Sequence, residues 1–302
     1  MLNATTDPAL PAAQDIDFVS GLGALAPRYD VVLCDVWGVL HNGIASFPAA
    51  REALARFRAR GGTVILVSNA PRPGHVVGEQ LSRFGVTPSS YDAILTSGDL
   101  TRDAVKQRGE QRVYHLGPDR DLPVYEGLGV AFGSVEDADY VVCTGLVDDE
   151  TETVADYQPL LRRMRERDLW MLCANPDIVV ERGEALVYCA GALAAAYEEL
   201  GGSTYYPGKP HPPIYERALT LAVELRNGVA VQPERVLAIG DAIRTDISGA
   251  RIFGLDALMI ARGIHARELC AETGGLDRDK AVAWLAGQSV RPNAIELALT
   301  WD

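Results

Sequence analysis

Three aspartates stand where their carboxylates could share one cation. Asp35 directly follows the apolar run Val31–Cys34, Asp241 ends a second apolar run, and Asp246 comes soon after it. Carboxylates that meet at one place repel each other unless a hard divalent cation joins them, and Mg²⁺ takes such oxygen ligands. The alternative for Asp35 alone is a core strand that ends in a solvated carboxylate. Together the three residues predict a magnesium site in which Asp35 is also a nucleophile.

A second set of polar residues is typical of a phosphate site. Ser68 and Asn69 follow the apolar run 63–67, and Lys209 lies in a Gly-Lys-Pro turn just before a predicted helix. A hydroxyl, exposed backbone N–H groups and one lysine can hold a tetrahedral oxyanion. Because a Gly-Lys-Pro turn alone is usually just a helix-capping turn, the prediction depends on the order of all these residues along the chain.

These residues need a scaffold that brings distant segments to one edge, and the hydrophobic pattern predicts one. Short apolar runs alternate with amphipathic segments, which is the pattern of an α/β fold with a doubly wound parallel sheet. Strand order 3-2-1-4-5 would place the ends of strands 1, 2 and 4 side by side, at the edge where such sheets bind ligands. The predicted strands cover 31–34, 63–67, 93–97, 235–241 and 257–261, and the helices cover 48–60, 76–84, 99–107 and 213–225.

The middle of the chain predicts a second, smaller α/β unit. Apolar segments at 112–117, 138–145 and 169–177 are typical of strands. Residues 151–168 form an amphipathic helical pattern for which Thr151 would be the N-cap. The alternation of strands and a helix within this region predicts that it folds as an insertion in the larger sheet.

The predicted organisation is a core of residues 1–105 and 204–302 with an inserted domain of residues 106–203. Residues 1–14 are expected to form a disordered arm, and Ile16–Leu25 a short helix. The segment GLGALA inside that helix fits G-x-G-x-x-A, but it precedes the first predicted strand. We therefore do not expect it to bind a nucleotide.

Charge and cysteine usage exclude several classes of protein. The 302-residue chain has a net charge of −13, which attracts neither nucleic acid nor an anionic membrane as a partner. The longest apolar tract, Ala185–Tyr197, is too short to span a bilayer, and no secretion signal is recognisable at the N-terminus. The cysteines form no CxxC pair, which predicts buried thiols in a cytoplasmic protein rather than disulfides or a zinc site. They are Cys34, Cys143, Cys173, Cys189 and Cys270.

Four segments in this order resemble the motifs of one enzyme family. They are DVWGVLHNG from Asp35, VSNAP from Val67, GKP from Gly208 and GDAIRTD from Gly240. The chain resembles the haloacid dehalogenase superfamily, in particular its class IIA branch of nitrophenylphosphatases, nucleotide-sugar phosphatases and pyridoxal phosphatases. ANPD at 174–177 and CAGALAAAYEELGG further on resemble the end of that branch's α/β cap. The resemblance implies a Rossmann-like core with the inserted region as the cap domain.

The resemblance also implies a role for each matched residue around the metal. Asp35 is the nucleophile that forms an aspartyl-phosphate, and it also binds Mg²⁺. Asp241 is a second metal ligand, and Asp246 lies outside the directly bound ligands. The backbone carbonyl of Trp37 is a further ligand, since any residue type can supply that group. Mg²⁺ is the implied cofactor.

Substrate binding is implied for a second group of residues. Ser68 and Asn69 bind the phosphate and Lys209 neutralises it, while Asn175 and Asp177 lie on the cap segment that faces the substrate. For the last two, a simple Asn-Pro-Asp turn is the alternative. Caps of this branch often dimerise, so a homodimer is expected. The implied substrate is a small phosphorylated metabolite.

One position departs from the family's pattern. The phosphatases carry a second aspartate two residues after the nucleophile, which protonates the leaving group and later activates water, and here that position is Trp37. Loss of acid–base help costs roughly 10²–10⁴-fold in rate, or about 3–5 kcal/mol of barrier. A sugar or alcohol phosphate would be affected most, and an acyl or aryl phosphate least.

Three functions fit this departure. In the first, a phosphatase keeps working with His41 as a replacement acid, the alternative for His41 being a turn residue without a role. In the second, the protein binds a phosphorylated ligand as a sensor or regulator. In the third, Asp35 attacks a substrate that needs no acid, such as a carbon–halogen bond, but the retained Asp241 and Asp246 count against it. We predict the first, a Mg²⁺-dependent phosphohydrolase.

Overall fold

The computed structural model describes residues 15–183 and 185–302, so the predicted arm at 1–14 lies outside the described residues. The chain divides into two compact units, each treated by itself below. The first contains residues up to 66 together with 84–93 and 217–302, and the second contains 67–83 and 94–216. This division differs from the predicted core and insertion, whose boundaries stay a prediction.

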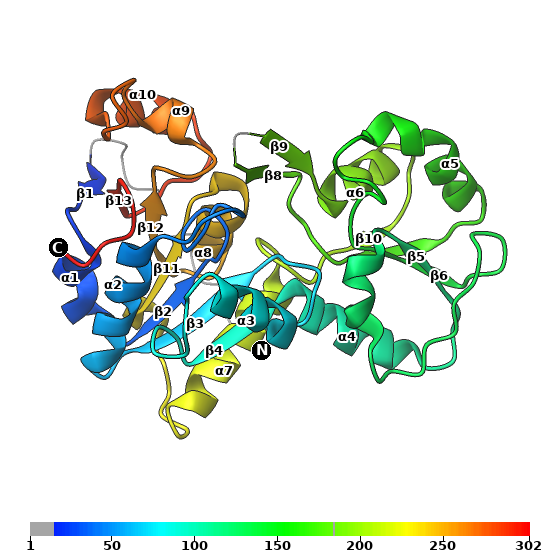
Figure 1. Ribbon diagram of the computed structural model, residues 1–302, viewed down its shortest axis with the longest axis horizontal. Coiled ribbons are helices and arrows are strands. Elements are labelled where there is room, and N and C mark those ends of the chain that lie inside the picture. The colour runs from blue at the N-terminus through cyan, green and yellow to red at the C-terminus, as the bar shows by residue number, and fades with distance from the viewer. Residues whose placement is uncertain (1–14, 184) are drawn as a thin grey trace. The chain divides into compact units, whose positions relative to one another are not determined.

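A seven-stranded sheet carries the strands predicted for the core. Its order β1-β13-β12-β11-β2-β3-β4 contains the predicted 3-2-1-4-5 arrangement, with two further strands at one end (Figure 1). β2 pairs in parallel with both β3 and β11, so buried β2 is an interior strand of the sheet. The strands are β1 Asp17–Phe18, β2 Val31–Cys34, β3 Thr63–Ser68, β4 Ala93–Thr96, β11 Val236–Gly240, β12 Asp256–Ile260 and β13 Ala294–Glu296.

The helices of the first unit follow the apolar periodicity of the sequence. In α2, Pro48 opens the helix, and Leu54 and Phe57 are buried at helical spacing. Position 62, just after the helix, is occupied by glycine, because a Cβ there would lie 2.2 Å from the Phe57 ring. The helices and helical turns are α1 Leu22–Leu25, η2 Ala26–Arg28, α2 Pro48–Ala59, η5 Pro233–Arg235, η6 Ile243–Ile247, α8 Ser248–Ile252, α9 Ala266–Leu269 and α10 Arg278–Ala286. α7, Pro212–Leu225, begins in the second unit and ends in the first.

The segment GLGALA serves packing within the first unit. The Leu22 N–H donates to the Thr300 carbonyl at 2.9 Å, and the Gly23 N–H donates to the Trp301 carbonyl at 2.8 Å. A Cβ at Gly23 would lie 2.6 Å from that Trp301 oxygen, so only glycine fits this close approach. The predicted helix over Ile16–Leu25 is correct only for its last turn, because its first residues form edge strand β1 instead.

The second unit contains its own parallel sheet, as the middle of the sequence predicts. The order is β10-β7-β6-β5, and a separate antiparallel hairpin joins β8 to β9. The strands are β5 Val113–Leu116, β6 Tyr140–Cys143, β7 Trp170–Cys173, β8 Val179–Arg182, β9 Ala185–Tyr188 and β10 Thr204–Tyr205. The helices and helical turns are α3 Gly74–Arg83, α4 Ser97–Arg108, η3 Asp119–Tyr125, η4 Val154–Tyr157, α5 Gln158–Glu166 and α6 Ala190–Glu199.

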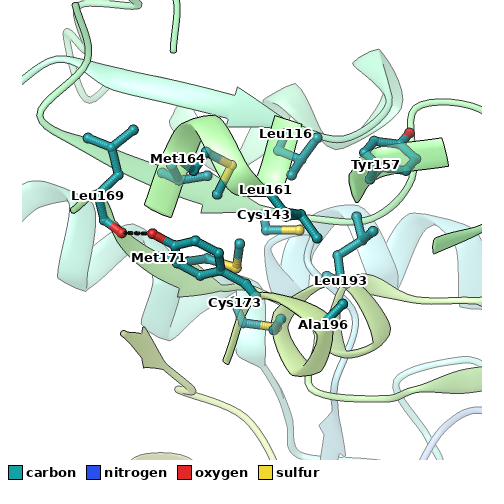
Figure 2. Packing of buried hydrophobic residues seen from close by; sticks show 14 of the residues in the cluster. Leu116, Cys143, Tyr157, Leu161, Met164, Leu169, Met171, Cys173, Leu193 and Ala196 are labelled. Carbon is teal, nitrogen blue, oxygen red and sulfur yellow. Dashed lines mark hydrogen bonds between the residues drawn. The ribbon is translucent and has the colours of Figure 1, made fainter. Parts of the chain in front are cut away.

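Figure 2 shows the hydrophobic core of the second unit, where side chains of α5 and α6 pack on the inner strands. Leu161, Leu193 and Met171 are fully buried. The Tyr197 hydroxyl lies in the same core and donates to the Leu169 carbonyl at 2.5 Å, which satisfies its polar group. All residues of this core belong to the second unit.

The predicted N-cap of the middle helix is wrong by two residues. Thr153, not Thr151, forms the capping box, with Asp156 as its partner. The Thr151 hydroxyl instead donates to Asp148 in the preceding turn. Both threonines suit an N-cap, and the competing local hydrogen bond to Asp148 decides between them.

Among the described residues, no helix has the length and apolar character needed to cross a bilayer.

Candidate active site

Three buried carboxylates of the first unit come together at the carboxyl end of the central strands. Asp35 directly follows β2 and Asp241 directly follows β11, and these strands are parallel neighbours. Asp246 lies in η6, the turn that comes next in the chain. One oxygen from each carboxylate lies within 4.8 Å of the others. The structure thus gathers the three aspartates that the sequence predicts as a metal site.

Backbone donors orient two of these carboxylates. The Ile264 N–H donates to Asp241 Oδ2 at 2.8 Å, and the Ala242 N–H donates to Asp246 Oδ2 at 3.2 Å. η6 is a π-helical turn, a form that occurs often at functional sites. It places Asp246 beside the end of β11, so each of the two carboxylates has one fixed oxygen.

Close approach by glycine backbone shapes the space around Asp241. A Cβ at Gly38 or at Gly263 would lie 2.1 Å from Asp241 Oδ2. Gly38 also has a φ of +80°, which favours glycine. Gly240 packs equally closely against Asp246, because a Cβ at Gly240 would lie 2.1 Å from Asp246 Cγ. Three segments of backbone therefore close on the carboxylates with no side chain between.

The donor set fits Mg²⁺. All three groups are carboxylates, the hard oxygen donors that Mg²⁺ binds, and three buried negative charges at this spacing are unfavourable without a cation. Asp35 and Asp241 would hold the ion, with Asp246 nearby. Whether the Trp37 carbonyl joins them stays a prediction.

Trp37 and His41 form an aromatic cluster on the flap that follows Asp35. The two rings make an edge contact with centroids 4.9 Å apart, and His41 also contacts Phe84 at 5.0 Å. The Gly43 N–H donates to His41 Nδ1 at 2.9 Å, so this nitrogen carries no proton. His41 is 2% exposed. With Nδ1 accepting, the ring is neutral and has its one N–H at Nε2. Its role as an acid stays a prediction.

In the second unit, the Asn69 side chain holds Lys209. The Lys209 N–H donates to Asn69 Oδ1 at 2.7 Å, and Asn69 Nδ2 donates to the Lys209 carbonyl at 3.0 Å. Nδ2 also donates to Asp177 at 2.9 Å. Both Asn69 and Lys209 are buried. The structure thus joins three of the predicted phosphate and substrate residues through one amide group.

Ser68 and Asn175 shape the backbone around this amide. Ser68, the last residue of β3, accepts from the Ala70 N–H at 3.2 Å. Asn175 Oδ1 accepts from the Asp177 N–H at 3.1 Å, which is the Asn-Pro-Asp turn given as the alternative above. Gly191 packs against that turn, because a Cβ there would lie 2.3 Å from the Pro176 oxygen. Contact of Asn175 and Asp177 with substrate stays a prediction.

Comparison with known families matches most of the motif-bearing sequence. Residues 32–131 match the model of haloacid dehalogenase-like hydrolases, and residues 206–283 match a HAD-hydrolase-like model. A haloacid dehalogenase-like hydrolase from Brucella suis 1330 is 48% identical, with a TM-score of 0.83 over 93% of this chain and 100% of that one. The chain belongs to the haloacid dehalogenase-like hydrolases. It is an enzyme of this type, in the class IIA branch.

Two curated relatives of this hydrolase are more distant. Ribonucleotide monophosphatase NagD of Escherichia coli K12 is 25% identical over 78% of this chain and 88% of its own length. 5'-Nucleotidase YutF of Bacillus subtilis 168 is 25% identical over 80% of this chain and 90% of its own length. Nearly the full length of both relatives is therefore matched.

Sequence reasoning missed several residues that support the carboxylate cluster of this hydrolase. Gly263 and Ile264 come just after β12, and His265 Nε2 accepts from the Ile243 N–H of η6 at 3.3 Å. Burial lowers the pKa of His265, which keeps the ring neutral and able to accept. The sequence did contain a signal for these residues. They follow the predicted strand at 257–261, and the carboxyl end of that strand must lie at the same edge of the parallel sheet as Asp241.

Proposed function

We propose that this hydrolase is a Mg²⁺-dependent phosphohydrolase that acts on a small phosphorylated metabolite. The observation that carries the proposal is the buried group of Asp35, Asp241 and Asp246 at the ends of adjacent strands. The curated relatives support it, because their names describe release of phosphate from nucleotides. An Asp35 oxygen beside a cation site is suited to attack phosphorus.

The reaction we propose has two steps at Asp35. In the first, a carboxylate oxygen attacks phosphorus, the bond from phosphorus to the leaving oxygen breaks, and an aspartyl-phosphate forms. In the second, water attacks that phosphorus and the carboxylate is restored as phosphate leaves. Bound Mg²⁺ would offset the negative charge of the phosphoryl group. The Ile264 and Ala242 N–H groups hold Asp241 and Asp246 in place throughout.

Phosphate binding is proposed for Ser68, Asn69 and Lys209. The support is the pair of hydrogen bonds between the Asn69 amide and the Lys209 backbone, which fixes the segment that carries the lysine. A buried ammonium group favours an anionic partner. Asn175 and Asp177 are proposed substrate contacts on the same basis, since Asp177 accepts from Asn69.

The cytoplasm is the compartment we propose, because the five cysteines are buried and form no disulfide, as suits a reducing environment. A homodimer is part of the proposal on the resemblance alone. Neither nucleic acid nor an anionic membrane is expected as a partner for a chain of this charge.

The test is turnover by the purified protein with and without Mg²⁺. The panel contains acetyl phosphate, 4-nitrophenyl phosphate, nucleoside monophosphates and sugar phosphates. We expect phosphate release that needs Mg²⁺ and disappears in Asp35→Asn. Asp103→Asn is the matched control, because it makes the same change at an exposed residue of α4.

Release that survives in Asp35→Asn would exclude this residue as the nucleophile. No turnover of any compound, with vanadate still bound, would instead favour the sensor or regulator function. Vanadate binding is measured by isothermal titration calorimetry in the presence of Mg²⁺.

A further inference from the structure

The flap that follows Asp35 contains a single titratable side chain. Residues 36–46 read VWGVLHNGIAS, so His41 is the one residue of the flap that could exchange a proton near neutral pH. Trp37, two residues after the nucleophile, offers an indole N–H that donates hydrogen bonds but does not act as an acid. Proton supply from this flap therefore depends on His41 alone.

His41 is held as a support for Trp37. Its ring lies between Trp37 and Phe84, and its Nδ1 accepts from the Gly43 N–H at 2.9 Å. The side chain is 2% exposed. An acid must regain its proton from solvent in each cycle, and a ring fixed and covered in this way is poorly placed to do so.

Trp37 is also in close contact with the flap backbone at Gly43. A Cβ at Gly43 would lie 2.6 Å from the indole Cζ2, and Gly43 has a φ of +84°, so glycine alone lets the flap close on the ring. The indole is half-buried. The flap therefore presents a rigid apolar surface, with no acid, two residues from the nucleophile.

We propose that this flap restricts the enzyme to phosphate compounds whose leaving group departs without a proton, namely acyl and aryl phosphates. The inference rests on the proposed function and names its substrate class. When the phosphorus–oxygen bond breaks, the electron pair stays on a carboxylate or phenolate, whose conjugate acids have pKa values of roughly 4 and 10. An alkyl phosphate would release an alkoxide, which is about as basic as hydroxide and therefore needs a proton as it departs.

Hydrolysis of the aspartyl-phosphate, the second step of the reaction, also needs a proton transfer. Water that attacks the aspartyl-phosphate must lose a proton, and with no base on the flap this proton passes to solvent or to the departing phosphate. The step is then slower by roughly 10²–10⁴-fold than with a positioned base. The phosphorylated form of Asp35 should accumulate during turnover of a reactive acyl phosphate.

Two measurements test the inference. The first compares kcat/KM for acetyl phosphate and 4-nitrophenyl phosphate with that for glycerol phosphate and ribose phosphate, and we expect the alkyl esters to be slower by roughly 10³-fold or more. The second is intact-protein mass spectrometry after acid quenching, with acetyl phosphate as donor. We expect a phosphorylated species in the wild type and none in Asp35→Asn.

Variants at Trp37 separate the flap from other causes. Trp37→Asp restores an acid and should raise the alkyl rates by roughly 10²–10⁴-fold while lowering the phosphorylated fraction. Trp37→Phe keeps an aromatic ring without an acid and should raise neither. Should Trp37→Asp fail to fold, as judged by circular dichroism, the wild-type series and the mass measurement decide the question alone.

Several results would overturn the inference. Wild-type alkyl and acyl rates within tenfold of each other would do so, as would an absent phosphorylated species during steady turnover. Alkyl turnover that is lost in His41→Asn, which keeps an acceptor for the Gly43 N–H, would identify His41 as the acid. No turnover and no phosphorylation with any donor would instead refute the proposed function itself.

Discussion

The three carboxylates should make the first unit less stable without a divalent cation than with one. Their oxygens lie within 4.8 Å of one another. At an effective dielectric constant of about 20, two unit charges at that distance repel by about 3.5 kcal/mol. Asp246→Asn keeps the shape of the side chain and removes two of the three like-charge pairs. In EDTA this variant should therefore melt at a higher temperature than the wild type.

Mg²⁺ should reverse the order. At a hundredfold excess over its Kd, a ligand bound only by the folded state stabilises it by about 2.7 kcal/mol. For a chain of 302 residues, with about 2.1 cal/mol/K of unfolding entropy per residue, the melting temperature should rise by roughly 4 °C. Asp246→Asn should gain less, because it holds the ion more weakly. Asp103→Asn, on the exposed face of α4, should behave as the wild type does.

The assay is differential scanning calorimetry across a Mg²⁺ titration, with EDTA as the zero point. It has a readout that does not depend on any substrate. A wild-type melting temperature that is indifferent to millimolar Mg²⁺, together with an Asp246→Asn variant that is no more stable in EDTA, would refute the metal site and the repulsion argument at once.

Three further predictions concern single residues of the two units. Gly263→Ala places a Cβ 2.1 Å from Asp241 Oδ2, so it should weaken Mg²⁺ binding at least tenfold by calorimetric titration, with the fold retained by circular dichroism. Burial raises the pKa of Glu296 to about 7, above its unfolded value of 4.5, so its contribution to stability is complete below pH 4.5 and is lost as the pH rises through 7. At pH 8 the Glu296→Gln variant should therefore have a free energy of unfolding in urea that is larger than that of the wild type by up to roughly 3 kcal/mol. If the difference between the two free energies does not grow as the pH rises, the burial argument is wrong. Tyr197→Phe leaves the Leu169 carbonyl without its donor and should destabilise the second unit by about 1 kcal/mol, as the same unfolding assay measures.

Several features of the fold follow from sequence pattern alone. β2 and β11 are continuous apolar runs, and β3, β4 and β12 are apolar at most positions, because a parallel strand inside a sheet is buried on both faces. Polar residues or glycine at the ends of these runs, such as Asp35 after β2 and Asp241 after β11, show in the sequence where the strands stop. The same pattern predicts the second α/β unit, whose strands β5, β6 and β7 occur where expected.

Other elements were beyond the reach of local pattern. β1 and β13 have two and three residues, too few for a period, and they pair only because the two ends of the described chain meet. In hairpin β8–β9, every position of β8 is half-buried and β9 is exposed except at Val187, so neither strand shows a clear alternation. The choice of Thr153 over Thr151 as N-cap depended on the hydrogen bond that Thr151 donates to Asp148, because both threonines fit the cap pattern equally well.

The sequence by itself indicated which chemistry to expect of this protein. Asp35 and Asp241 each follow an apolar strand, Asp246 comes soon after Asp241, and Trp37 stands at the position where the family resemblance predicts an acid. Residue identity and strand pattern are local properties, so they can be read before the chain folds.

Only the tertiary structure decided how these groups are held. The Asn69 amide binds the backbone of Lys209, which lies 140 positions further along the chain, and Gly38 and Gly263 close on Asp241 from separate loops. His41, predicted as a replacement acid, is buried against Trp37. Contacts of this kind depend on which distant segments meet, and packing rather than local pattern settles that.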